Sequence, residues 1–371
     1  MKHLLLGIAL SVALFGCSDD KTKSETQAAA DVAAGKVIAE RECKGCHGLD
    51  GKGTAPAIPN LAGQRERYVF VSLMEYKERK RMHAALRDIA GQMTEAELHN
   101  VASYYAGLPP IPAAQGKVFS PYEHGKVLAA ACANCHGEDG NSKIPGTPSL
   151  AGQQPRYFAV AVQEYLNRVR EIDPMHSLLR ELKGLDVESV ALYFASQTPA
   201  QRPAAPFGDP VTGEPLTAVC GGCHGSHGVS TDAATPSVAG QDAQYLVNAI
   251  KAYGKTRHHP GMQRSIFGLT DKDIDNIAAF YVVQKSKAAE SGQTLIQELT
   301  EKCNRCHGGD RDNPAMAVPK INGQDKDYLV MALRAYRDDK RESSVMHKMS
   351  LPYSDSVIES ISSFYANQPA K

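Results

Sequence analysis

The pattern of apolar and polar residues after the first thirty positions is that of helices. In residues 66–80, Tyr68, Val71, Leu73 and Tyr76 form an approximate stripe along one helical face, and no segment of the chain shows a competing strand pattern. Such a stripe is typical of a helix that packs one face against a core. The sequence therefore predicts an all-α protein.

The helical pattern recurs four times, and three helices are expected in each repeat. In the first repeat the first two cover residues 32–43 and 66–80. The third begins at a polar residue followed by early acids, which is a common helix start. The residues that mark this start are Thr94, Thr270, Ser354 and, in the second repeat, Asp186.

Other residues recur in register with these helices, and we call the four repeats modules 1 to 4. Each module contains a proline, then a Gly-Gln pair, then two tyrosines eight residues apart. The prolines are Pro59, Pro148, Pro236 and Pro319, the glutamines are Gln64, Gln153, Gln241 and Gln324, and the first tyrosines are Tyr68, Tyr157, Tyr245 and Tyr328. Proline-rich joints at 109–112 and 199–206 separate modules, whereas the third joint, 285–290, has no proline. We expect four domains, at 31–110, 116–199, 206–286 and 288–371.

The first seventeen residues resemble a bacterial lipoprotein signal peptide. Lys2 precedes an apolar run, Leu4 to Phe15, that is too short to span a bilayer. Cys17 ends a sequence similar to a lipobox, although plain cleavage with an incidental Cys17 is the alternative. On the lipoprotein interpretation Cys17 carries the lipid, and residues 18–30 form a flexible tether to the membrane.

Composition excludes some classes of function. The 41 basic residues balance the 41 acidic ones, so nothing favours nucleic-acid binding. The hydrophobic content of 42% and the charged content of 22% are those of a globular protein. Nine cysteines are present, and apart from Cys17 they form four pairs, which leaves none for a disulfide framework.

Each pair belongs to a Cys-x-x-Cys-His motif, the attachment sequence for covalent haem c. Alone, one such motif is also compatible with zinc or thioredoxin-like chemistry, but four repeats that all include the histidine favour haem. The expected attachment residues are Cys43, Cys46, Cys132, Cys135, Cys220, Cys223, Cys303 and Cys306, and the expected iron ligands are His47, His136, His224 and His307. A proline lies twelve residues after each histidine. Because a ligand histidine usually donates its second ring N–H to a carbonyl, we predict that these prolines supply the acceptors; the alternative is that they only shape a loop.

Methionines in three modules are candidates for the opposite iron ligand. Met175, Met262 and Met346 lie 27, 26 and 27 residues after the module's proline, each five residues after an arginine. A thioether opposite histidine raises the haem potential, which suits an electron carrier.

Module 1 departs from this pattern, because Leu86 stands five residues after Arg81. Met82 is the nearest methionine and is the first candidate ligand if the loop shifts. His83 is the alternative, and a five-coordinate iron is the third possibility.

These motifs resemble tandem class I cytochrome c domains, most closely the cytochrome c4 and c553 group. The residues that carry the resemblance include Cys132 to Asn141, Pro148 to Gln153, Tyr157, Arg170, Met175 and Tyr193-Phe194. The resemblance implies four small helical bundles, each around a covalent haem, in what looks like a doubled form of the usual two-domain c4. It also implies electron transfer between redox proteins, with no small-molecule substrate. The export signal predicts a periplasmic location with a lipid anchor in the outer membrane. The rival hypothesis is a redox enzyme, peroxidase-like or oxidising a small inorganic species, with haem 1 as its catalytic centre.

Overall fold

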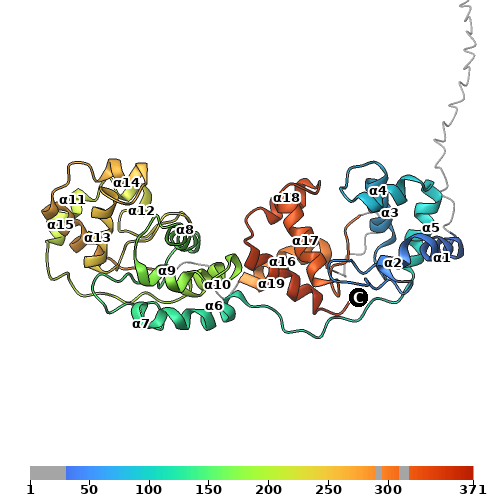
Figure 1. Cartoon of the computed structure of the whole chain (residues 1–371), viewed down its shortest axis with the longest axis horizontal. Coiled ribbons are helices and arrows are strands. Elements are labelled where there is room, and N and C mark those ends of the chain that lie inside the picture. Colours follow the sequence, from blue (N-terminus) through green and yellow to red (C-terminus); the bar gives the residue numbers. More distant parts are fainter. Residues whose placement is uncertain (1–30, 289–294, 309–316, 371) are drawn as a thin grey trace, which may run out of the picture.

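The computed structural model describes residues 31–288, 295–308 and 317–370 (Figure 1). Regular structure in these ranges is entirely helical, which confirms the predicted fold class. The expected signal peptide, Cys17 and the tether lie outside the described residues. Among the helices that are described, none is long and apolar enough to cross a membrane.

Modules 1 and 2 have the same order of elements. Each begins with a helix that runs, through a short turn of altered pitch, into the Cys-x-x-Cys-His motif. In module 1 the elements are α1 (Val32–Ile38), the π-helical turn η1 (Ala39–Cys43), α2 (Lys44–His47), α3 (Glu66–Lys77), α4 (Ala84–Gly91) and α5 (Glu95–Ala106). In module 2 they are α6 (Pro121–Ala129), the 3₁₀ turn η2 (Ala130–Cys132), α7 (Ala133–His136), α8 (Pro155–Leu166), α9 (Asp173–Leu179) and α10 (Gly184–Ala195).

Modules 3 and 4 repeat this order with small variations in the first helix. Module 3 contains α11 (Pro210–Leu216), α12 (Gly221–His224), α13 (Ala243–Tyr253), α14 (Pro260–Ser265) and α15 (Asp271–Val282). Module 4 contains α16 (Leu295–His307), which includes the motif, α17 (Lys326–Arg337), α18 (Ser344–Ser350) and α19 (Asp355–Ala366).

Each module has one short helix that the three-helix prediction misses. It follows the arginine and is represented by α4, α9, α14 and α18. Local capping explains three of the four. The side chains of His83, His259 and Ser343 accept the N–H of the third helical residue, and proline stands in the first turn of α9 and α14. A helix of six to eight residues carries too few apolar positions to show a period.

The predicted start of the last helix is confirmed in three modules. Thr94, Thr270 and Ser354 are the cap residues, and the two threonines form capping boxes with the acid three residues later. In module 2 the cap residue is instead Lys183. Asp186 lies inside the first turn and accepts the Lys183 N–H at 3.1 Å.

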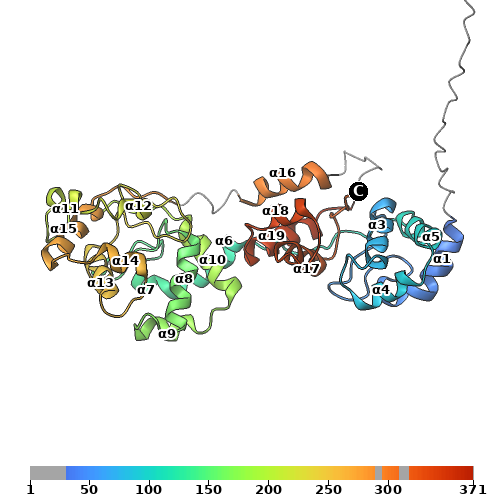
Figure 2. The same cartoon turned by 90° about the horizontal axis from the view of Figure 1, so that it is seen from above.

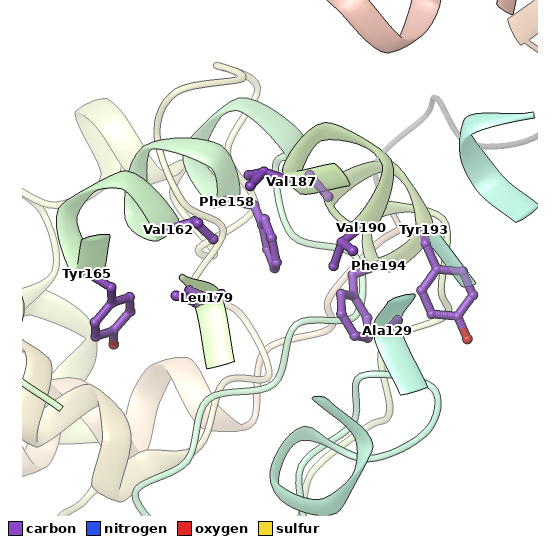
Figure 3. Packing of buried hydrophobic residues seen from close by; sticks show 10 residues of the cluster. Ala129, Phe158, Val162, Tyr165, Leu179, Val187, Val190, Tyr193 and Phe194 are labelled. Atoms are coloured by element: carbon purple, nitrogen blue, oxygen red, sulfur yellow. The ribbon is translucent and has the colours of Figure 1, made fainter. Parts of the chain in front are cut away.

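Each module has its own apolar core, drawn from its own helices. In module 2 the core includes Phe158, Val190 and Phe194, which face one another between α8 and α10 (Figure 3). Glycines let the first and last helices cross closely. A Cβ on Gly125 would lie 2.0 Å from the carbonyl oxygen of Ser189, so no larger residue fits there. Corresponding clusters occupy the other three modules.

The modules are not arranged in the order of the sequence. Along the long axis of the molecule the order is 3, 2, 4, 1, and both views agree on it (Figures 1 and 2). Module 1 contacts module 4, and module 2 contacts module 3, through many hydrogen bonds. Between these two pairs, α19 of module 4 packs against α6 and α10 of module 2.

The joint between modules 1 and 2 runs along module 4 before it enters module 2. The backbone N–H groups of Ala114, Gly116 and Phe119 donate to Ala366, Asn367 and Ser363 of α19 and the residue after it. The fourteen residues between α5 and α6, 107–120, therefore span a whole module, which allows the nested arrangement.

Candidate haem-binding sites

The ring of each motif histidine is held by the carbonyl of the proline twelve residues later. The Nδ1–O distances are 3.0 Å for His47–Pro59, 2.8 Å for His136–Pro148, 2.8 Å for His224–Pro236 and 2.9 Å for His307–Pro319. A carbonyl oxygen can only accept, so Nδ1 must carry the proton. The predicted role of the prolines is thus confirmed in all four modules.

Burial then leaves each of these imidazoles neutral. It lowers the pKa of His47, His136, His224 and His307, and the hydrogen bond to proline offsets only part of this effect. In a neutral ring with Nδ1–H, the lone pair is on Nε2. Each module therefore presents one imidazole nitrogen in the state that binds iron.

The two cysteines of each motif differ in their exposure. The first, such as Cys43, is half-buried against the core, and the second, such as Cys46, is exposed, and all eight thiols are free. Burial raises the pKa of Cys43 to about 11, so this thiol stays protonated at neutral pH. In module 2, Ser142 Oγ donates to the carbonyl of Cys135 at 3.0 Å and braces the motif's end. This pair of positions suits two thioether bonds to one haem.

Met175, Met262 and Met346 occupy the same structural position. Each is the third residue of its module's short helix and is half-buried. In α14 and α18 the cap side chain accepts the methionine's own N–H at 3.2 Å. The cap therefore fixes the backbone of the candidate ligand, a relationship that sequence spacing only hinted at.

In module 1 the third residue of the short helix is Leu86, and its N–H is accepted by His83 Nδ1 at 3.3 Å. The Nδ1 lone pair of His83 is therefore engaged by the backbone of the short helix. Met82 is 74% exposed, with its sulfur 3.9 Å from Arg87 Nη1. Neither candidate is thus presented as a ligand in this arrangement.

The arginine and tyrosines of each module meet those of its partner module. Arg170 is 5% exposed and lies over the rings of Tyr157 and Tyr165. Burial, and after it the neighbouring Tyr245 of module 3, raises the pKa of both of these tyrosines. In the other pair, Arg341 lies 4.5 Å from the ring centroid of Tyr336. Each pair thus has two arginines and four tyrosines at its centre.

The charge partners of these arginines show whether the sites suit haem. Arg81 and Arg170 pair with Glu75 and Glu164 of their own modules. For Arg257 and Arg341, by contrast, no carboxylate partner occurs among the described residues, although they are half-buried over Tyr253 and Tyr336. A cation shielded from water without an acid is costly unless an anion joins it. Haem carries two propionates, so the histidine donors, the paired cysteines and these two cations fit this group.

Three further histidines have structural contacts. His99 pairs with Glu66, and His124 pairs with Asp186, each at 2.8 Å. His347 Nδ1 donates to the carbonyl of Tyr336 at 2.8 Å. None of these three is a candidate haem ligand.

Comparison with known proteins now adds the family. The cytochrome c family profile matches residues 32–108 and 122–182. Cytochrome c4 of Pseudomonas aeruginosa is 30% identical over 207 residues, which cover 52% of this chain and 98% of that protein. The chain is a c4-like class I c-type cytochrome.

Further similar proteins were found among curated sequences and solved structures. A protein of Stutzerimonas stutzeri named thiosulfate dehydrogenase electron acceptor is 30% identical over 52% of this chain and 93% of its own length. A solved structure of reduced cytochrome c4 from Pseudomonas stutzeri is 27% identical, with a TM-score of 0.41 over 45% of this chain and all of that one.

Membership of this family and the four attachment motifs give the cytochrome four covalent haem c groups. It is an electron-transfer cytochrome. Almost the whole of each of the two curated relatives above matches about half of this chain.

Proposed function

We propose that this cytochrome is a tetrahaem electron carrier that faces the periplasm and has no substrate turnover of its own. The observation that carries the proposal is the set of four His–Pro hydrogen bonds. Each holds a neutral imidazole in the orientation that a proximal haem ligand needs. On this proposal the four modules are four cytochrome c domains, at 31–110, 116–199, 206–286 and 288–371.

The distal ligands of haems 2, 3 and 4 are, on this proposal, Met175, Met262 and Met346. Their shared position at the third residue of a short helix supports the assignment. A thioether opposite histidine leaves no open position on iron and favours the reduced state. These three haems are therefore suited to passing electrons and unsuited to binding substrate.

Haem 1 differs, and we propose that its distal face has no protein ligand. The support is that Leu86 takes the place of the methionine, His83 is engaged as a helix cap, and Met82 points to solvent. The same arrangement favours a second candidate function, in which haem 1 binds a small ligand or oxidant while haems 2 to 4 relay electrons.

Redox proteins are the proposed partners. One relative's name, thiosulfate dehydrogenase electron acceptor, makes a dehydrogenase the first donor to test. The lipoprotein-like sequence at Cys17 supports attachment to the outer membrane by lipid alone.

Carbon monoxide tests whether haem 1 is open, and a turnover assay then separates the two candidate functions. The reduced, haem-loaded protein is mixed with carbon monoxide, and the fraction of haem that binds quickly is measured from the absorption spectrum. An open haem 1 predicts one quarter. Steady-state assays with hydrogen peroxide then decide the function: turnover would favour the enzyme, and its absence would favour the carrier.

A further inference from the structure

The glutamine of each Gly-Gln pair forms two hydrogen bonds with the backbone of another module. Gln241 of module 3 accepts the backbone N–H of Ser149 at 2.7 Å, and its amide donates to the carbonyl of Ser149 at 2.9 Å. Gln153 of module 2 returns the same two bonds to Ser237, at 2.9 Å and 3.0 Å. The two modules are thus joined by a reciprocal, twofold-like exchange.

Modules 1 and 4 are joined in the same way. Gln324 accepts the N–H of Asn60 at 2.7 Å and donates to its carbonyl at 2.9 Å. Gln64 accepts the N–H of Lys320 at 2.8 Å and donates to its carbonyl at 2.9 Å. All four glutamines are between 6% and 8% exposed, so water does not compete for these bonds.

Each glutamine is hydrogen-bonded to the residue directly after a proline. The carbonyl of that proline accepts the hydrogen bond of the ligand histidine. The N–H of Ser149 and the carbonyl of Pro148 belong to one peptide group. Gln241 accepts from one end of this group, and His136 donates to its other end. Hydrogen bonds in such a chain polarise one another, since drawing on the N–H makes the carbonyl oxygen more negative.

We propose that Gln64, Gln153, Gln241 and Gln324 are positioning residues that tune the haem of the partner module, in the nested pattern 1 with 4 and 2 with 3. The chain of bonds runs from glutamine through the Pro–X peptide to the ligand histidine. A more negative carbonyl makes the imidazole a stronger donor to iron and stabilises the oxidised state. Each glutamine therefore lowers the potential of a haem that its own module does not bind.

The inference goes beyond electron carriage, because it states which two haem modules form each structural pair. Sequence order would pair modules 1 with 2 and 3 with 4. The structure instead places Gln64 against Lys320 and Gln153 against Ser237. Within the described residues, no side-chain hydrogen bond joins one of these glutamines to a module outside its pair.

Replacement of Gln241 tests the direction of the effect. In the full haem-loaded protein, Gln241→Leu removes both bonds and is expected to raise the midpoint potential of haem 2, with a smaller effect on haem 3. Gln241→Glu keeps an acceptor oxygen, so the potential of haem 2 should return to or below the original value. Haem 2 is identified in the potentiometric titration by the loss of its near-infrared sulfur-to-iron band in Met175→Leu.

Gln197→Leu is the matched control, because Gln197 bonds only within module 2, to the carbonyl of Tyr193 and to Ser196. It should leave the potentials of haem 2 and haem 3 unchanged. A shift confined to haem 3 in Gln241→Leu, or equal potentials in the Leu and Glu variants, would overturn the proposal.

Hydrogen exchange tests the pairing without relying on haem redox chemistry. Gln64→Leu frees the N–H of Lys320, so exchange in a peptide covering 318–325 should become faster, while that in 148–154 stays unchanged. The reverse pattern would refute the nested pairing even if all haems remain functional. Failure of electron carriage would leave this result intact, so the two proposals fail separately.

Discussion

Arg341 donates a hydrogen bond of 3.0 Å to the hydroxyl of Tyr68, although the two residues are 273 positions apart. Tyr68 also lies within 3.5 Å of Arg81 from its own module. The hydroxyl thus lies between two guanidinium groups, one from each module of the pair. This contact places the centre of the 1/4 pair at the tyrosines that follow the Gly-Gln segments.

Loss of this hydroxyl should weaken the contact between modules 1 and 4. Tyr68→Phe removes a bond to a charged donor, and we expect a loss of about 1.5 to 3 kcal/mol in the unfolding free energy of the pair. Denaturant unfolding, monitored through hydrogen exchange in α17, measures this loss of free energy. Tyr157→Phe is the control, because the donors of Tyr157 are 3.5 Å away and the loss should be smaller. Equal losses in both variants would contradict the role given to Arg341.

The buried tyrosines predict sensitivity to alkali. Burial raises the pKa of Tyr157, Tyr328 and Tyr336 above the ordinary value of about 10. The unfolded chain then loses protons first as pH rises, so stability is complete below about pH 10 and falls above it, by up to about 1.4 kcal/mol per pH unit for each tyrosine. Denaturant midpoints measured from pH 8 to 11 check this. Tyr157→Phe should flatten the decline, and an unchanged slope would count against the prediction.

The short helix of module 1 predicts a gain of function at the iron. Leu86 occupies the third helical residue, as the methionines do, so Leu86→Met should add a fourth share to the near-infrared sulfur-to-iron band. Met175→Leu should remove one share of the original three. Met82→Leu is the control and should leave the band unchanged, whereas a loss in that variant would assign Met82 as the ligand after all.

Membrane attachment depends on Cys17 if the lipoprotein interpretation is right. Cys17→Ser should release the protein from the membrane fraction or block its maturation, since no other part of the proposed anchor is lipidated. Cell fractionation with haem staining measures the distribution. Unchanged membrane association of the variant would rule out anchoring at Cys17.

Residue register predicted much of each site. The twelve-residue spacing between histidine and proline correctly identified the carbonyl acceptor, because a ligand ring needs one and proline cannot compete as a donor. The cap residues Thr94, Thr270 and Ser354 were equally clear, since a cap is a local property of a few adjacent residues. The short helix was missed, although Pro174 and Pro260 in first turns were a usable signal.

The nested pairing lay beyond what register could reveal. Gln64 and Gln153 stand in identical sequence contexts, so the pattern shows that each has a role but not which module receives it. The prolines in the joints indicate that these segments are stiff, but they do not indicate which module the next one will pack against. The choice depends on contacts between surfaces of distant segments, such as those of α19 with α10, which leave no periodic trace in the sequence.

Reductive titration of the haem-loaded protein tests the central claim most directly. The protein is first shown by intact mass to carry four haems, and electrons are then added quantitatively under anaerobic conditions. An electron carrier with one haem per module predicts uptake of four electrons per chain, fully recovered on reoxidation. Uptake of fewer than four, or electrons lost to turnover during the cycle, would contradict the account.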